Sequence, residues 1–223
     1  MNTEEIIKKV SSYIRQNLYG EETGHDWWHI VRVLNISNEI NKTEKKNTFV
    51  ITMIALLHDI YDDKFSDGNT RTQLIQLLQK LEIIDLLKPT ELENVLFSIE
   101  NLSYKGGFNK VEISDEGKIV QDADRLDAIG AIGIARVFAY GGKKGREIFN
   151  PEQGIITIEN ENEYRNVQRH SINHFYEKLL KLKDTMNTET GKKIATQRTN
   201  YMQTFLDEFY QEWDGKDLID TIN

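Results

Sequence analysis

The sequence predicts an all-α protein folded as one compact domain. Only 2 of its 223 residues are proline, so few positions interrupt a helix. Alternating apolar and polar runs, which mark half-buried strands, are scarce, whereas apolar residues recur at spacings of three and four. No internal repeat, low-complexity segment or linker divides the chain. We therefore interpret residues 1–223 as a single helical domain that buries about 70% of its unfolded surface.

Capping and turn residues place the helices along the chain. Thr3, followed by Glu4 and Glu5, begins the first helix, because acidic residues favour a helix N-terminus. Thr90 and Glu93 have the spacing of a capping box and begin another. The predicted helices span about residues 3–18, 26–40, 48–60, 70–81, 90–102, 131–140, 163–182 and 190–212, with one more running from 114 through 124.

Two of these predictions concern packing and chain breaks. In the second helix, Trp28 and Val31 are expected to face largely inward, together with Leu34 and Ile36. The pair of glycines at 141–142 is expected to end a helix. Residues 141–160 then form the longest irregular stretch, and a loop of this length in a compact domain is often functional.

Composition narrows the possible function classes. The net charge of −8 argues against broad nucleic-acid binding through the phosphate backbone. The absence of cysteine excludes disulfides, thiolate metal sites and a cysteine nucleophile. No charged leader and no apolar stretch long enough to span a bilayer is present, so we expect a cytoplasmic protein that does not bind a membrane.

A histidine followed directly by a carboxylate, His58-Asp59, ends the apolar run of residues 49–57. Such a run is normally core, and charged groups there are costly unless they are paired or bind a metal. Adjacent helical residues point about 100° apart, so both can bind one ion only if it sits between their directions. Further ligands must then come from elsewhere in the chain.

Two other segments supply candidate ligands. His25 and His29 lie four residues apart near the start of the second helix, and Asp124 and Asp127 lie three apart among apolar residues. A set of two histidines and two aspartates suits Mn, Fe, Co, Ni or Zn better than Mg or Ca. Spacing alone leaves a buried hydrogen-bonded cluster without metal equally open.

The order His29, His58-Asp59, Asp124 resembles the signature of the HD-domain metal-dependent phosphohydrolases. Three sequence motifs are similar to those of the bacterial branch typified by the YpgQ and YedJ proteins. They are His-Asp-Trp-Trp-His-Ile-Val-Arg-Val, Leu-Leu-His-Asp and Gln-Asp-Ala-Asp-Arg-Leu-Asp-Ala-Ile-Gly. The similarity runs from about residue 20 to about residue 210. It implies an HD-domain helical bundle whose metal ligands are those four residues.

The resemblance also implies a reaction. We expect one divalent ion, most simply Mn²⁺, with Ni²⁺, Co²⁺, Fe²⁺, Zn²⁺ or Mg²⁺ as alternatives, and hydrolysis of a nucleoside triphosphate at the α-phosphate to a monophosphate and pyrophosphate. The alternatives are a 5'-nucleotidase or other phosphomonoesterase, a phosphodiesterase, and a non-catalytic nucleotide-binding domain. Residue chemistry alone reaches only metal-assisted hydrolysis of a phosphoester or phosphoanhydride.

Catalytic roles beside the metal are assigned to three residues. In similar HD phosphohydrolases an acidic residue at the offset of Asp62 assists the attacking water, and Asp63 is its rival. His25, one turn before His29, is expected to neutralise charge or to protonate a leaving oxygen. The alternative, in which His25 is the ligand instead of His29, is less favoured because His29 matches the family's histidine.

Substrate contacts are expected from the residues around these ligands. Arg125 could bind a phosphate through its guanidinium group. Asp127 could hydrogen-bond a sugar hydroxyl or support one of the metal ligands. A structural pair between the two is equally open. Asp26 is either near the substrate or an N-cap. The cations expected to contact phosphates are Lys64, Lys143, Lys144 and Arg146.

Two remaining groups are interpreted as structural. His170 and His174 share an apolar helix face and lack an accompanying His-Asp pair, so we expect core rather than metal ligands. The C-terminal aromatics fit core or the surface of a homodimer, and core is preferred; they are Phe205, Phe209, Tyr210 and Trp213.

Overall fold

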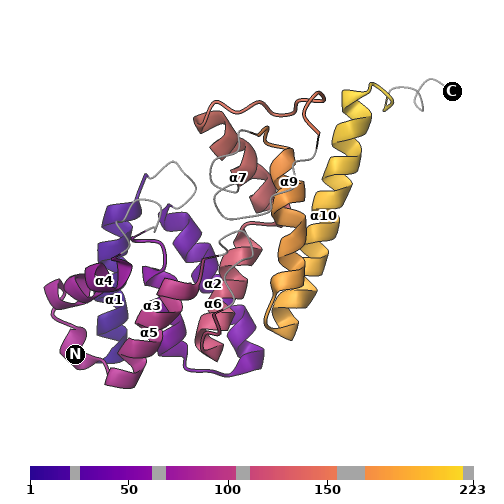
Figure 1. The fold of residues 1–223 in the computed structure, drawn as a ribbon. Coiled ribbons are helices and arrows are strands. Elements are labelled where there is room, and N and C mark those ends of the chain that lie inside the picture. The colour runs from indigo at the N-terminus through magenta and orange to yellow at the C-terminus, as the bar shows by residue number, and fades with distance from the viewer. Residues whose placement is uncertain (21–25, 62–68, 104–110, 155–168, 218–223) are drawn as a thin grey trace. The chain divides into compact units, whose positions relative to one another are not determined.

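The computed structural model describes residues 1–20, 26–61, 69–103, 111–154 and 169–217. Within these ranges the secondary structure is nine α-helices and two 3₁₀ helices, without strands, so the all-α prediction is confirmed (Figure 1). The elements are α1 (Thr3–Leu18), α2 (Trp27–Glu44), α3 (Thr48–Leu57), α4 (Thr70–Lys80), η1 (Ile84–Leu86), α5 (Pro89–Asn101), α6 (Asp115–Asp127), α7 (Gly130–Lys143), α9 (Asn173–Glu177), η3 (Leu179–Thr185) and α10 (Glu189–Trp213).

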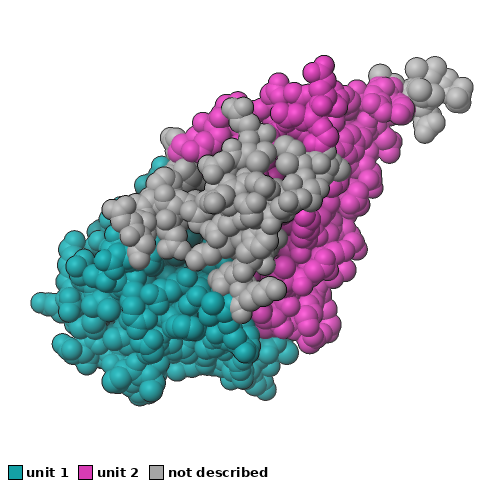
Figure 2. All heavy atoms as spheres, in the orientation of Figure 1, with its two compact units in different colours: residues 1–124, 158–168 teal, residues 125–157, 169–223 magenta. Residues whose placement is uncertain are grey.

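The chain divides into two compact units (Figure 2). The described residues of the first lie within 1–124, and those of the second lie within 125–154 and 169–217. The division falls inside α6, directly after Asp124. That the whole chain is one domain stays a prediction.

Helix α3 is the centre of the first unit. Every residue from Val50 to Leu57 is buried, because α3 packs against α1, α2 and α5 (Figure 1). Its start is fixed by Asn47, whose side-chain oxygen accepts the backbone N–H groups of Phe49 and Val50. Burying each large apolar side chain contributes about 1.5–3 kcal/mol, so this helix is held firmly in place up to the His58-Asp59 pair.

Two neighbouring helices differ in detail from the sequence-based expectation. The first helix is capped by Asn2, which forms a capping box with Glu5. In α2, Trp28 is 54% exposed, so its predicted inward orientation is wrong. Ile30 and Val33 are fully buried instead, and Trp28 lies on the opposite side of the first helical turn.

The second unit is built around α10, a helix of 25 residues that packs against α7 and η3. Its buried stripe is Gly191, Ala195, Thr199, Met202 and Leu206. The half-buried Phe205 stacks on the fully buried Phe175, with ring centroids 5.8 Å apart. Trp213, in contrast, is 51% exposed.

The predicted long helix over 163–182 is wrong where the structure describes it. The short helix α9 ends at Glu177, Lys178 leaves helical geometry with φ −133° and ψ −61°, and η3 follows. The apolar spacing at Ile172, Phe175 and Leu179 fits a succession of short helical turns as well as one continuous helix.

The glycine pair at 141–142 does not end α7, which continues to Lys143. Gly141 instead permits close packing within the second unit. A Cβ atom at this position would lie 2.2 Å from Oγ of Ser171. Packing rather than helix termination explains this glycine.

Candidate metal centre

His29 is brought to the site by the first turn of α2. Asp26 is the N-cap of this helix, and its carboxylate accepts the backbone N–H of His29 at 2.8 Å. Asp26 is therefore the N-cap of α2, and a role near the substrate stays a prediction. Its acceptor bond ties the backbone of His29 to the helix start, and the His29 side chain is completely buried.

His58 and Asp59 directly follow α3, so the buried helix determines where they lie. Nδ1 of His58 lies 2.8 Å from the carbonyl oxygen of Ala55. A carbonyl can only accept, so this contact places the imidazole proton on Nδ1 and leaves the lone pair of Nε2 available to a metal. Sequence reasoning missed Ala55, although its spacing of three from His58 was visible in the helical run.

Asp124 comes from α6, whose apolar side is buried in the first unit through Ile119, Val120 and Ala123. The Asp124 side chain is 35% exposed. The helix therefore turns a carboxylate toward solvent-accessible space while its apolar side anchors it.

Four side chains from these three places converge. Nε2 of His29 lies 3.2 Å from Nε2 of His58 and 3.1 Å from Oδ2 of Asp59. Oδ1 of Asp124 lies 3.5 Å from Nε2 of His29 and 4.0 Å from Nε2 of His58. The ligand atoms offered by His29, His58 and Asp59 all lie within 4.8 Å of one another.

This donor set fits a divalent metal ion. Two imidazole nitrogens that approach to 3.2 Å repel each other unless a proton or a cation lies between them. The two neighbouring carboxylates supply the negative charge that balances a doubly charged cation. Together with the two nitrogens, the carboxylates form a mixed set of nitrogen and oxygen ligands. Transition metals bind such a set well, whereas calcium prefers oxygen ligands alone.

Several predicted site residues lie outside the described residues. They are the three proposed catalytic groups and one cation, namely His25, Asp62, Asp63 and Lys64. Their assigned roles stay predictions.

Arg125 and Asp127 belong to the second unit, where each has a structural partner. Arg125 donates to the carbonyl oxygen of Thr185, and Asp127, only 1% exposed, forms an ion pair with Arg136 at 2.7 Å. A structural pair was considered for Asp127, but its partner is Arg136 rather than Arg125. Roles in substrate binding for Arg125 and Asp127 stay predictions.

The predicted phosphate-contacting cations at the end of α7 gather around one aromatic ring. Nζ of Lys144 lies 5.8 Å and Cζ of Arg146 lies 5.3 Å from the ring centroid of Tyr140. Lys143, the last residue of α7, is exposed. Cation–π contacts of this kind position the charges without neutralising them.

His170 and His174 have hydrogen-bonding partners within the second unit, in agreement with a structural role. Nδ1 of His170 accepts the backbone N–H of Asn173, and Nδ1 of His174 lies 2.5 Å from Glu177, which also pairs with Arg169. Burial lowers the pKa of both histidines.

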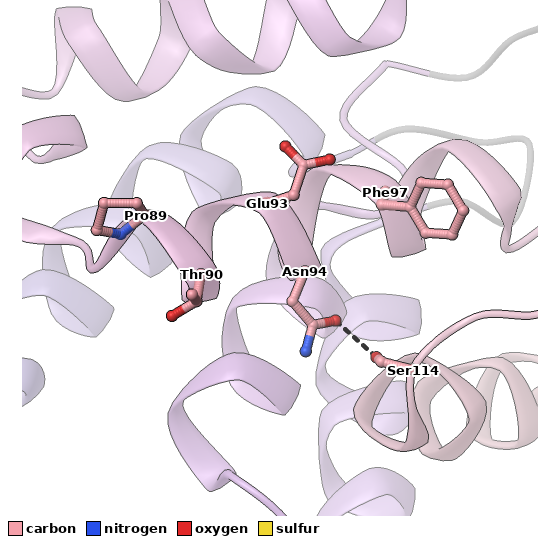
Figure 3. A pocket seen from close by; sticks show the side chains of 6 residues that line it. All are labelled: Pro89, Thr90, Glu93, Asn94, Phe97 and Ser114. Atoms are coloured by element: carbon pink, nitrogen blue, oxygen red, sulfur yellow. Dashed lines mark hydrogen bonds between the residues drawn. The ribbon is translucent and has the colours of Figure 1, made fainter.

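A surface cavity of about 510 Å³ lies elsewhere in the first unit (Figure 3). None of the predicted site residues lines it. Its lining comes from α5 and the residue before α6, and consists of Pro89, Thr90, Glu93, Asn94, Phe97 and Ser114.

Comparison with known proteins identifies the family to which the chain belongs. Residues 27–129, which contain all four candidate ligands, match the HD domain family. The whole chain is 34% identical over 212 residues to the protein YpgQ of Bacillus subtilis, covering 94% of this chain and 95% of that protein. The chain therefore belongs to the HD domain family, in its YpgQ-like branch, and the resemblance expected from the sequence is confirmed.

Solved structures agree with this assignment. A crystal structure of a Lactobacillus plantarum protein superposes with a TM-score of 0.84 at 36% identity, covering 96% of this chain and 100% of the other. A Bacillus thuringiensis HD-superfamily hydrolase gives 0.73 at 40% identity, covering 96% and 99%. Bacillus subtilis YpgQ in complex with ADP gives 0.73 at 30% identity, covering 95% and 97%.

The family assignment makes the chain an HD-superfamily hydrolase with a group of side chains that could hold a metal. None of the described helices combines the length and the apolar character needed to cross a bilayer.

Proposed function

We propose that the chain hydrolyses nucleoside triphosphates at the α-phosphate, releasing pyrophosphate and a nucleoside monophosphate, with one divalent metal held by His29, His58, Asp59 and Asp124. The observation that carries the proposal is the convergence of two imidazole Nε2 atoms, 3.2 Å apart, with two carboxylates. Such a set suits a metal-dependent hydrolase of phosphorylated substrates.

The residues of this chain have separate tasks at the site. His58 is held in the tautomer whose Nε2 is free of its proton, because Nδ1 is engaged with the carbonyl of Ala55. Asp59 and Asp124 balance the positive charge. Asp62 is proposed to orient or deprotonate the attacking water, with Asp63 as its rival, and His25 is proposed to act on the leaving group. When bound, the metal lowers the pKa of water and polarises a phosphoryl oxygen.

We propose Mn²⁺ as the metal. Held by His29, His58, Asp59 and Asp124, the ion would still have positions for water and a phosphate oxygen. A purely oxygen-preferring ion such as Mg²⁺ suits two nitrogen donors less well.

A nucleotide is proposed as the substrate on two grounds. The sequence words around the ligands resemble the pyrophosphohydrolase branch of the family, and the related Bacillus subtilis YpgQ is known in complex with ADP. The cations Lys64, Arg125, Lys143, Lys144 and Arg146 are proposed contacts for its phosphates.

The reaction is tested by hydrolysing a deoxynucleoside triphosphate with Mn²⁺ in water enriched in ¹⁸O. Attack at the α-phosphorus places the label in the monophosphate and releases unlabelled pyrophosphate. Label in orthophosphate, released from a triphosphate or a monophosphate, would contradict the proposal and indicate a phosphomonoesterase or attack at the terminal phosphate. Bound nucleotide without turnover in Mn²⁺, Co²⁺, Ni²⁺ or Mg²⁺ would indicate a non-catalytic binding domain.

A further inference from the structure

One face of α6 carries a row of residues that meets α5 and ends at Asp124. The row starts at Ser114, the residue directly before α6, and continues with Gly117, Gln121 and Asp124 inside the helix. Spacings of three, four and three place these residues on the same side. The first three members each contact α5 or the residue that follows it.

The row begins with a polar junction between α5 and the start of α6. The Ser114 hydroxyl donates to Oδ1 of Asn94 at 2.6 Å (Figure 3). The same hydroxyl accepts the backbone N–H of Gly117 at 3.0 Å. Glu116 accepts from the Asn94 amide at 3.1 Å, and its other oxygen accepts the backbone N–H of Asn47 at the start of α3. The start of α6, which carries Asp124, is thus hydrogen-bonded to the start of α3, which leads to His58 and Asp59.

Gly117 allows the two helices to approach closely. A Cβ atom at this position would lie 2.6 Å from Oγ of Ser98 in α5. The first turn of α6 therefore has little freedom to slide along α5.

Gln121 makes the corresponding connection near the site. It is 8% exposed, and its Nε2 donates to the carbonyl oxygen of Leu102, the C-cap of α5, at 3.1 Å. Carbonyl groups at a helix C-terminus lack partners inside the helix, so this bond supplies one. Asp124 follows Gln121 by one helical turn.

We propose that Gln121 is a positioning residue that sets the place of the Asp124 carboxylate relative to His29 and His58. The inference rests on the proposed metal site. A shift of one residue along a helix axis is about 1.5 Å, whereas metal–ligand distances tolerate only about 0.2 Å. A hydrogen bond one turn before Asp124 can therefore prevent displacements of the carboxylate that are larger than metal coordination tolerates.

The test uses Gln121→Met, which removes the amide and keeps an unbranched side chain of similar length. The matched control is Gln73→Met in α4. Gln73 is half-buried, and its buried side-chain oxygen has no hydrogen-bond partner among the described residues. Binding of Mn²⁺ is measured by calorimetry, and the visible absorption of bound Co²⁺ reports ligand geometry. The melting temperature of the metal-free proteins is recorded separately.

We expect Gln121→Met to weaken Mn²⁺ binding roughly 10- to 100-fold and to change the Co²⁺ spectrum, while Gln73→Met leaves both unchanged. Gln121→Asn, whose shorter amide draws back from Leu102, serves if the first variant does not fold, and it is expected to weaken Mn²⁺ binding as well. Wild-type Mn²⁺ affinity in a folded Gln121 variant, even one with a lower melting temperature, would overturn the proposal.

The outcome separates this inference from the proposed reaction. Weakened Mn²⁺ binding in the variant supports the inference, whether or not the wild type hydrolyses nucleotides. Unchanged Mn²⁺ binding together with normal nucleotide hydrolysis overturns the inference alone. A wild-type protein that binds no divalent metal overturns both.

Discussion

Nε2 of His29 and Nε2 of His58 lie 3.2 Å apart although 29 positions separate the two residues in sequence. Helix α3 is buried along its length, and α2 begins at a capped turn, so the folding core brings the two imidazoles together. Their approach is unfavourable without a shared proton or cation.

Replacing one imidazole should remove most of the metal affinity. We expect His58→Gln to weaken Mn²⁺ binding by more than the roughly 100-fold that loss of an outer partner can cost, because a direct donor is lost. Asp85→Asn, at an exposed position in η1, is the matched control and should bind as the wild type does. Equal affinities for His58→Gln and the wild type, measured by calorimetry, would rule out His58 as a ligand.

The stability of the metal-free protein should fall as the solution becomes acidic. Burial lowers the pKa of His170, whose ordinary value is 6.5, so the unfolded chain binds a proton more readily than the folded one. The contribution of His170 to the free energy of unfolding is complete above about pH 6.5. It is lost as the pH falls toward the lower pKa of the folded state. In His170→Asn the melting temperature should depend less on pH between 7.5 and 5.5. Parallel curves for the two proteins would show that His170 does not contribute.

The ion pair between Asp127 and Arg136 should stabilise the fold, because Arg136 compensates the charge of a buried carboxylate. Arg136→Met leaves a carboxylate that is only 1% exposed without its 2.7 Å partner. Breaking a buried pair costs roughly 3–5 kcal/mol, but Arg136 is 22% exposed and Arg198 also acts on Asp127, so we expect about 2–3 kcal/mol. Urea unfolding of Arg136→Met, Asp127→Leu and the double variant measures the coupling. Additive effects in the double variant would refute a direct interaction.

A side chain at position 117 should force α6 away from α5. Alanine in place of glycine favours a helix by about 1 kcal/mol, but here its Cβ would lie 2.6 Å from Oγ of Ser98. Overpacking of this kind costs about 1–3 kcal/mol, so Gly117→Ala should be net destabilising. Ser98→Ala removes the nearest atom and should recover part of the loss, as a double-mutant cycle can show. A Gly117→Ala protein more stable than the wild type would mean that the helices separate freely.

The fold class and the ligand-bearing motifs could be predicted because both depend on residues that are close together in the sequence. The apolar run of 49–57 gave α3, and His58-Asp59 at its end stood out as charge beside core. The orientation of Trp28 was misjudged because periodicity alone does not show which side of a helix has neighbours. The roles of Gln121 and Arg136 could not be foreseen, since each depends on a partner from another element.

Elemental analysis shows whether the side chains of His29, His58, Asp59 and Asp124 hold one cation. Wild-type protein and Asp59→Ala are loaded with Mn²⁺, freed of excess metal by gel filtration, and analysed for metal per chain. We predict one equivalent in the wild type and almost none in the variant, with nucleotide hydrolysis lost in parallel. Equal metal content in both proteins, or none in either, would show that these four residues do not form a metal site.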